Sequence, residues 1–258
     1  MSTPTDRLSQ ARADTGAADP PPGIGRAYEL IRSAIRGGQL RNGEGLTLSS
    51  LQVLTGLDSR SVKSAVELLV THNVLHRESV TGLAVGPRMV QIPVNDHMLG
   101  DPTTPGDVIS CGLAVVQLEH RMVQSTPVIR ERLQTDAGMV LLVEQLGVLD
   151  GQTIYVRAGY YTEPDNTALS RAIASVDRMG SRPMADVFLE LFGTEMATCR
   201  TSIEAVRCEA SAAGHLGVAP GSPVLLRETL VGDSCGRARA LSYTHYRSDR
   251  VSISDTSQ

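Results

Sequence analysis

The stretch LDSRSVKSAVELL, residues 57–69, decides how the first part of the chain is interpreted. Asp58 is a residue type that favours the N-cap of a helix. With the apolar residues that follow facing inward, Arg60 and Glu67 lie on the opposite side of the helix. The stretch therefore predicts an amphipathic helix with a small cationic tip at its start. The apolar residues that recur at helical spacing are Val62, Ala65, Val66, Leu69 and Val70.

Two helices and a hairpin are predicted around this stretch. IGRAYELIRSAIRGG (24–38) has helical apolar spacing and ends in two glycines, and TLSSLQVLTG (47–56) is a shorter helix that stops at Gly56. VLHRESVTGLAVG (74–86) contains two short apolar runs around a turn at Gly82, as in a hairpin. This order predicts a mostly α winged helix-turn-helix domain at 24–88. Its third helix would enter the DNA major groove, and the hairpin would be the wing.

Charge is distributed unevenly along the chain. The net charge is −4, yet residues 24–88 contain eight Arg and Lys against five Asp and Glu, which gives +3. Residues 1–23 carry −1 and include three consecutive prolines, so we expect a disordered arm there. The remainder carries −6. A basic module joined to an acidic body favours DNA binding, but a solvated helix tip or a protein-interaction module would give the same pattern.

Composition excludes several classes of protein. No run of 18 apolar residues is present, and no apolar core of a secretory signal begins the chain, so we expect a cytoplasmic protein without a membrane partner. The four cysteines show no CxxC spacing, and no histidine pair completes a zinc set. We therefore expect reduced thiols, no metal and no cofactor.

The second part of the chain contains an internal repeat. After a predicted linker at 89–107, LQTDAGMVLLVEQLGVLD from Leu133 aligns without gaps with LGVAPGSPVLLRETLVGD from Leu216, at an offset of 83. A helix-like segment precedes each copy, and a turn and a strand ending in tyrosine, at Tyr160 or Tyr246, follow it. The Asp150–Gly151 pair is a strong hairpin signal. Duplication of helix, strand, turn and strand predicts an antiparallel sheet in an α+β domain at 108–258.

Two segments carry a resemblance to a known family, LGVAPGSPVLLRETL (216–230) and LSYTHYRSDR (241–250). The first part of the chain resembles the winged-helix transcription regulators of the GntR family. The second resembles the UTRA domain of that family's HutC branch, whose fold is similar to chorismate lyase. The resemblance covers roughly residues 24–253. It implies a DNA-binding homodimer, often a repressor, whose UTRA domain binds a small effector and is not an enzyme.

The expected DNA contacts depart from the family pattern. The Pro-Ser-Glu-Arg segment usual in the family is replaced near Leu46–Ser49, Ser59 stands at a usual arginine position, and Thr81 replaces the arginine of the wing. Each lost phosphate contact weakens binding and lowers its salt dependence. Operator DNA, palindromic for a dimer, remains the predicted partner. The residues expected to contact it are Ser59, Arg60, Ser61, Lys63, Thr81 and Gly82.

The expected effector site also departs from the family. Gln145 and Gly147 stand where sugar-phosphate-sensing members carry arginines, and Arg157 stands where they carry a glutamate. A site with one cation argues against a phosphosugar and favours a small, partly apolar carboxylate or lactone-like metabolite. Strand alternation suggests that Arg157 shares its face with neighbouring tyrosines. The residues expected to bind the effector are Gln145, Arg157, Tyr161, Met184 and Tyr246.

Three functions are compatible with these patterns. The leading hypothesis is a transcription regulator, a repressor released from its operator by a metabolite. The alternative is a degenerate family member that binds a ligand or protein but not operator DNA. A lyase or hydrolase is less favoured, since the six histidines have no Ser/Asp or Cys partners at a known catalytic spacing and no catalytic residue is predicted. His245 and Tyr246 are neighbours on one strand, so only one of them should face a binding site.

Overall fold

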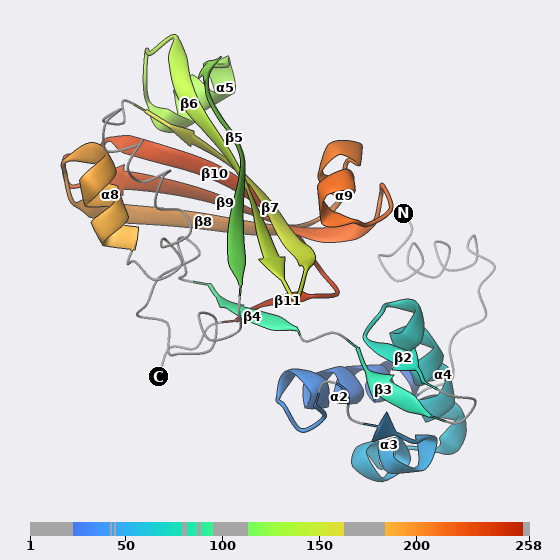
Figure 1. Cartoon of the computed structure of the whole chain (residues 1–258). Helices are drawn as coiled ribbons and strands as arrows, with labels where there is room; N and C mark the ends of the chain where they lie inside the picture. The colour runs from blue at the N-terminus through green and yellow to red at the C-terminus, as the bar shows by residue number, and fades with distance from the viewer. Residues whose placement is uncertain are drawn as a thin grey trace, which may run out of the picture. The chain divides into compact units, whose positions relative to one another are not determined.

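The structure is a computed structural model of the 258-residue chain. It describes residues 23–41, 43, 45–78, 82–86, 89–94, 113–162 and 184–254. The chain divides into two compact units, Met1–Arg88 and Met89–Gln258 (Figure 1). Except for Gly23, the arm predicted for residues 1–23 lies outside the described residues.

The N-terminal unit contains the three predicted helices. Thr47 forms a capping box with Ser50 at the start of the second helix, and Asp58 caps the third through the amide of Ser61. A small antiparallel sheet in the order β1-β3-β2 completes the described part of the unit. The elements are α2 (Ile24–Arg36), β1 (Gly45–Leu46), α3 (Leu48–Thr55), α4 (Ser59–Thr71), β2 (Leu75–Arg77) and β3 (Leu83–Val85).

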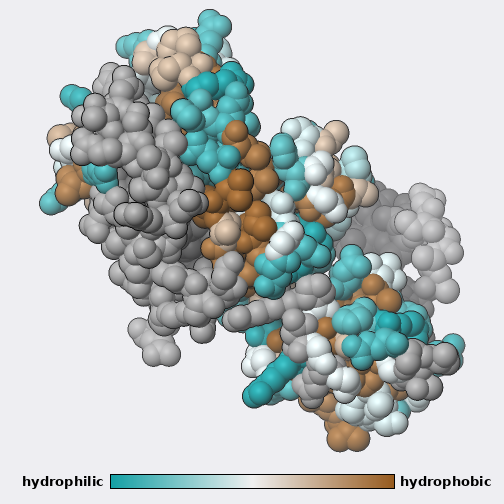
Figure 2. All heavy atoms as spheres, in the orientation of Figure 1, coloured by the Kyte–Doolittle hydropathy of each residue, from teal (hydrophilic) through white to brown (hydrophobic). Residues whose placement is uncertain are grey.

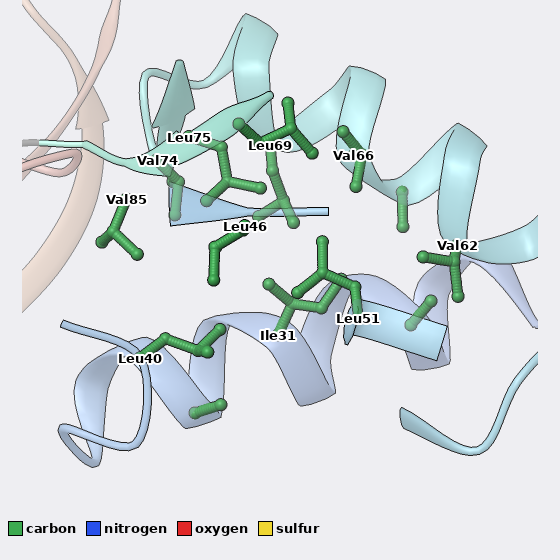
Figure 3. Close-up of a cluster of buried hydrophobic side chains, with 14 of the residues drawn as sticks. Ile31, Leu40, Leu46, Leu51, Val62, Val66, Leu69, Val74, Leu75 and Val85 are labelled. Atoms are coloured by element: carbon green, nitrogen blue, oxygen red, sulfur yellow. The ribbon is translucent and has the colours of Figure 1, made fainter. Parts of the chain in front are cut away.

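One hydrophobic cluster holds these helices and strands together. Figure 3 shows Ile31 of α2, Leu51 of α3 and Leu69 of α4 pointing toward one another, and all three are fully buried. Val62, Ala65 and Val66 of α4 are buried as their spacing predicted, and Val70 is partly buried against the same cluster. The buried stripe of α4 therefore faces the core, and its charged side faces solvent.

The C-terminal unit is built on a six-stranded antiparallel sheet. Its strand order is β5-β6-β7-β10-β9-β8 (Figure 1). Two short helices, α5 and α9, pack on one face of the sheet, whereas α8 packs on the other. The elements are β5 (Ala114–Gln124), α5 (Pro127–Leu133), β6 (Met139–Leu149), β7 (Gln152–Tyr161), α8 (Met184–Phe192), β8 (Met196–Arg207), α9 (Ala210–Leu216), β9 (Pro223–Asp233) and β10 (Ala238–Arg247).

The predicted duplication is visible in the sheet. A long strand, a short helix and a hairpin occur twice, and the two hairpins meet where β7 pairs with β10. Asp150 and Gly151 both have positive φ, 51° and 74°, as a two-residue hairpin turn between β6 and β7 requires. This confirms the antiparallel α+β prediction for the second part of the chain.

The gap-free alignment of the two copies is wrong by one residue in the strands. Each hairpin contains a register shift, beside Gly147 in β6 and beside Val231 in β9, and these positions are 84 residues apart. The helices keep the offset of 83, since Leu133 and Leu216 each precede a left-handed C-cap residue. A one-residue shift moves every side chain of a strand to the other face, so the sequence alignment paired residues from opposite faces.

The predicted linker at 89–107 includes a strand. Strand β4 (Val90–Pro93) pairs in parallel with β11 (Val251–Ser254). Val90 and Ile92 are buried at 4% and 0% exposure. The segment was interpreted as a linker because its partner strand lies about 160 residues away, beyond the reach of local pattern analysis. Residues 95–107 lie outside the described part of the chain.

The YRSDR ending has a structural role in this chain. Arg247 donates two hydrogen bonds to the carboxylate of Asp249, with distances of 3.0 and 2.6 Å. Arg250 is 1% exposed and donates to the side-chain oxygen of Gln152. These contacts fix the turn between β10 and β11, and the carbonyl of Arg250 accepts from the amide of Val90. None of the helices within the described ranges has the length and apolar character needed to cross a membrane.

Candidate functional site

The exposed tip of α4 brings together three of the predicted DNA-contact residues. Ser59, Arg60 and Lys63 are exposed at the first turns of the helix. Asp58 precedes them, and its Oδ1 accepts from the amide of Ser61 at 2.9 Å. Hydrogen bonds from Ser61 hold the pKa of Asp58 below its usual range. The tip therefore presents two cations and a hydroxyl next to a carboxylate that is already used by the helix.

Ser61 does not belong to this exposed tip. Its side chain is buried at 2% exposure, and its hydroxyl donates to Oδ2 of Asp58 at 2.7 Å. The structure thus favours a capping role for Ser61 over the predicted contact with phosphate. Gly82 is partly buried at the hairpin, and Thr81 lies outside the described residues.

An ion pair connects α4 to the hairpin. Arg77 of β2 donates to Glu67 of α4 at 2.5 Å, and both side chains are about half exposed. The hydrogen bond from Arg77 lowers the pKa of Glu67, to which the charge of Lys63 adds. Because Arg77 already binds Glu67, this carboxylate does not neutralise the cations at the end of α4 that carries Arg60.

The second candidate site lies on the face of the large sheet opposite α5 and α9. Register pairs place residues of neighbouring strands in rows across this face, since side chains alternate between faces along each strand. Two adjacent rows differ from the rest because most of their side chains are polar. The first row is Gln145, Arg157, Thr244, Arg227 and Ile203, and the second is Val143, Gly159, Ser242, Thr229 and Thr201. We call these two rows the polar band.

The polar band is buried. Five of its members are at most 6% exposed: Arg157, Arg227, Thr229, Ser242 and Thr244. Apolar side chains occupy the rows on either side of it. Burying two guanidinium groups and three hydroxyls in one place is costly unless they bind partners. Such a concentration is therefore expected at a functional site.

The two ends of this face are covered by different elements. Phe188 of α8 is fully buried against Leu141 and Tyr161 at one end. At the other end Val90 and Ile92 of β4 pack with Tyr155 and Tyr246, whose ring centroids are 5.8 Å apart. The polar band thus lies between two apolar clusters.

Arg157 is held by a neighbour on its own strand. Its NH2 group donates to the hydroxyl of Tyr161 at 3.2 Å. The ring of Tyr161 lies over Gly159, where an added Cβ would come within 2.8 Å of the ring and of the hydroxyl oxygen. Gly159 therefore makes room for the ring that orients Arg157.

Arg227 is a candidate residue that the sequence interpretation missed. It is 3% exposed, pairs in register with Thr244 and faces the same side as Arg157. Its NH2 group donates to the carbonyl of Val94 at 2.8 Å, and among the described residues its Nε has no hydrogen-bond partner. A second cation therefore lies on the face where the sequence predicted only one. Along β9, Arg227 alternates with Leu225 and Thr229 on one face, and this alternation could have identified it from the sequence. The gap-free alignment of the two copies instead assigned it to the opposite face.

The other predicted effector residues are placed as follows. Gln145 pairs in register with Arg157, and Tyr246 is buried on the same face, two residues from Thr244. His245 lies on the opposite face, where burial lowers its pKa and the charge of Glu209 opposes this. Met184 begins α8, and its side chain is not among the described ones.

The described residues contain no group of three or more His, Cys, Asp or Glu side chains arranged to hold a metal ion. Cys199 lies on β8 near the polar band, and burial raises the pKa of its thiol, against the smaller effects of Thr201 and Arg227. The two guanidinium groups of the polar band are of a type that binds anions.

Comparisons with known proteins agree with this architecture. PhnF from Mycobacterium smegmatis has a similar structure, with 17% identity, a TM-score of 0.57 and coverage of 90% of this chain and 99% of that chain. A GntR-family transcriptional regulator has 15% identity, a TM-score of 0.51 and coverage of 92% and 98%. At these identities the likeness shows the fold alone. No match among curated proteins was found. The UTRA domain profile matches residues 113–252, more than half of the sequence, and the chain therefore belongs to the UTRA domain family.

Proposed function

We propose that this protein is an effector-responsive DNA-binding transcription regulator of the GntR family's HutC branch, a cytoplasmic repressor released from its operator by a small metabolite. The observation that carries the proposal is the exposed cationic tip of α4. That tip begins a helix packed in a basic unit of the same chain that contains a UTRA domain. DNA binding by helix-turn-helix proteins uses the N-terminal residues of such a helix at base edges.

The proposed DNA surface consists of Ser59, Arg60 and Lys63, with the hairpin residues Thr81 and Gly82 as the wing. Arg60 is the residue best suited to base recognition, because its guanidinium can donate two hydrogen bonds to a guanine. Lys63 and Ser59 are suited to phosphate contacts. Ser61 is left out of the proposed surface because its hydroxyl is engaged by Asp58.

The proposed effector surface is the polar band together with Tyr161 and Tyr246, with α8, which begins at Met184, packed over one end of the same face. Gln145 and Arg157 of the first hairpin supply an amide and a cation. A second buried guanidinium, that of Arg227, favours an anionic effector over a neutral lactone. No catalytic step is part of the proposal.

We also propose a homodimer formed mainly by the C-terminal units. Strand β5 is at one edge of the large sheet, and its Val116, Leu118 and Met122 are 45%, 41% and 51% exposed. Figure 2 shows hydrophobic side chains gathered on the face of the molecule where β5 runs. A two-fold dimer implies a palindromic operator with half-sites spaced by whole helical turns.

The alternative of a ligand- or protein-binding member without operator DNA is favoured by one observation. Val53 of α3 is 86% exposed, and Leu54 and Leu68 are 42% and 43% exposed. Exposed apolar side chains suit a protein partner better than the charged phosphate backbone of DNA.

Selection of bound fragments from a random DNA library by the full-length chain distinguishes the transcription regulator from the family member that does not bind operator DNA. We expect enrichment of a palindromic sequence. Arg60→Ala should then weaken binding by about 1–3 kcal/mol and relax preference at one base position. Arg26→Ala, at an exposed arginine of α2, serves as the control and should change affinity little. Failure of the wild-type chain to enrich any sequence would contradict the regulator proposal.

A further inference from the structure

Strand β8 forms the edge of the large sheet that lies opposite β5 (Figure 1). It pairs with β9 along one side, and its other side pairs with no strand of the described residues. Residues 202–205 are all exposed, although neighbouring side chains of a strand point to opposite faces. Within the described part of the chain, β8 therefore offers a row of backbone donors and acceptors to another strand.

The edge of β8 lacks the usual devices that prevent pairing. Natural edge strands are commonly protected by proline, lysine or a bulge, and β8 contains neither proline nor lysine. Its register shift against β9 lies at its start, between Met196 and Thr198, and the ladder is regular from there to Arg207. Arg200, Glu204 and Arg207 are its charged residues, and all three are exposed. The signs of these charges therefore decide which strand the edge accepts.

The charges of β8 match those of a second copy of the same strand. When a two-fold axis normal to the sheet relates two antiparallel strands, side chains that face each other remain on the same side of the sheet. With the axis at Ser202, Arg200 of one chain lies opposite Glu204 of the other, and this pair occurs twice. An axis at Arg200 or at Glu204 would bring like charges together, and an axis at 201 or 203 would leave both charges opposite neutral residues.

The uncharged residues of β8 agree with the same register. Thr201 of one chain then lies opposite Ile203 of the other, and Thr198 lies opposite Val206. Cross-strand pairs of β-branched side chains favour strand pairing. Ile203 is 37% exposed in the single chain, and a second strand would cover part of this apolar surface.

We infer that the edge of β8 pairs with β8 of a second copy of this chain, antiparallel and centred on Ser202. This contact is distinct from the proposed dimer contact at β5, because the two strands lie at opposite edges of the sheet. Use of both edges links one dimer to another, so association should continue beyond the dimer as the concentration rises. Neither DNA nor an effector is needed for the β8 contact.

Sedimentation velocity of the full-length chain without DNA, over a range of micromolar concentrations, tests the contact. Arg200→Glu places like charges opposite each other, and so does Glu204→Arg. Each variant alone should therefore lose about tenfold in the association constant of this contact. An equimolar mixture of the two variants should recover it, because every facing pair then has opposite charges. Arg207→Glu makes the same charge change on the same strand outside the facing pairs, and should behave as the wild type.

The double variant Arg200→Glu/Glu204→Arg restores opposite charges within one chain, and it serves if either single variant does not fold. Leu118→Asp, at the opposite edge of the sheet, should leave the effect of Arg200→Glu in place, which separates this contact from the one at β5. Equal association of the wild type and Arg200→Glu would overturn the inference. Loss of association in both single variants without recovery in their mixture would indicate another register or another partner strand, and would overturn it as well.

Discussion

The two halves of the large sheet share a framework and differ in chemistry. Each hairpin carries its register shift at the equivalent place, and each returning strand carries a buried tyrosine, Tyr161 or Tyr246, on the face of the polar band. Where the first half has Arg157, the equivalent position of the second is Ser242. Where the second half has Arg227, the equivalent position of the first is Val143.

This difference shows which features the duplication supplies. The repeated strand, turn and strand gives two equivalent hairpins, and the features that the two hairpins share serve packing. The arginines break the symmetry, and the register places both in one row beside Thr244. A symmetric sheet with asymmetric substitutions is thus sufficient to produce a single buried cationic site.

The largest expected effect is on the free energy of unfolding, when a pair of side chains in the first half is changed to the sizes found in the second half. In the first half Gly147 pairs with Tyr155, and an added Cβ at Gly147 would be 1.6 Å from the Tyr155 ring. In the second half the equivalent pair is Val231 with Ala240. Gly147→Val should cost about 3 kcal/mol through overpacking, and Tyr155→Ala about 3–5 kcal/mol through the cavity that it leaves.

The double variant reproduces the pair found in the second half. Its free energy of unfolding should exceed the additive expectation by about 1–3 kcal/mol, as measured by denaturant unfolding of all four proteins. Strict additivity would show that the two halves are not equivalent at this place.

The hairpin turns provide a second comparison. Asp233 is buried, accepts from the amides of Cys235 and Arg237, and pairs with Arg239. Asp150, at the other turn, is exposed with a φ of 51°. Asp233→Ala should cost about 3 kcal/mol because it removes the ion pair with Arg239 and leaves the amides of Cys235 and Arg237 without their acceptor. Asp150→Ala should cost about 1 kcal/mol, from backbone strain.

The pH dependence of unfolding sharpens this comparison. Burial raises the pKa of Asp233, but hydrogen bonds from Arg237 and Arg239 outweigh it, so that the pKa is lowered on folding. Asp233 therefore stabilises the fold above the ordinary aspartate pKa of about 3.9, and this stability is lost as the pH falls through the lower folded value. Asp233→Ala should flatten the acid limb of the stability profile. An unchanged acid limb would contradict the assignment.

A smaller effect is expected at Gly159. Gly159→Ala should displace the ring of Tyr161 and cost about 1–3 kcal/mol. It should also weaken binding of the anionic effector, since the Tyr161 hydroxyl orients Arg157. Gly138→Ala is the control, because nothing lies within 4 Å of the added Cβ. Equal effector affinity in the two variants would show that Tyr161 does not position Arg157.

Local patterns were sufficient for much of the fold. The helical spacing in α4 gave its buried stripe, Asp58 gave its cap, and Asp150–Gly151 gave the hairpin. Each of these depends on residues within one or two turns of each other. The strand β4 could not be found in this way, because β11, about 160 residues later, supplies its partner.

The candidate site was predicted only in part for a related reason. Arg157 was predicted from the family resemblance, with which the alternation within its own strand agrees. The position of Arg227 depends on the register between four strands. The second copy of the repeat has one extra residue between α9 and β9, so a gap-free alignment assigns the side chains of β9 to the wrong face. Ser61 was misassigned because a hydroxyl near a helix start can bind the cap as readily as a phosphate.

The most direct test of the regulator account is effector release measured on the selected DNA. A small anion that the wild-type chain binds, chosen by titration calorimetry of carboxylates and inorganic phosphate, is titrated into the complex of the chain with fluorescent DNA, and anisotropy reports the bound fraction. We expect the wild type to release the DNA, whereas Arg227→Met binds the same DNA with unchanged affinity and is not released at that anion concentration. Release of Arg227→Met at the wild-type concentration would contradict the claim that the polar band controls DNA binding.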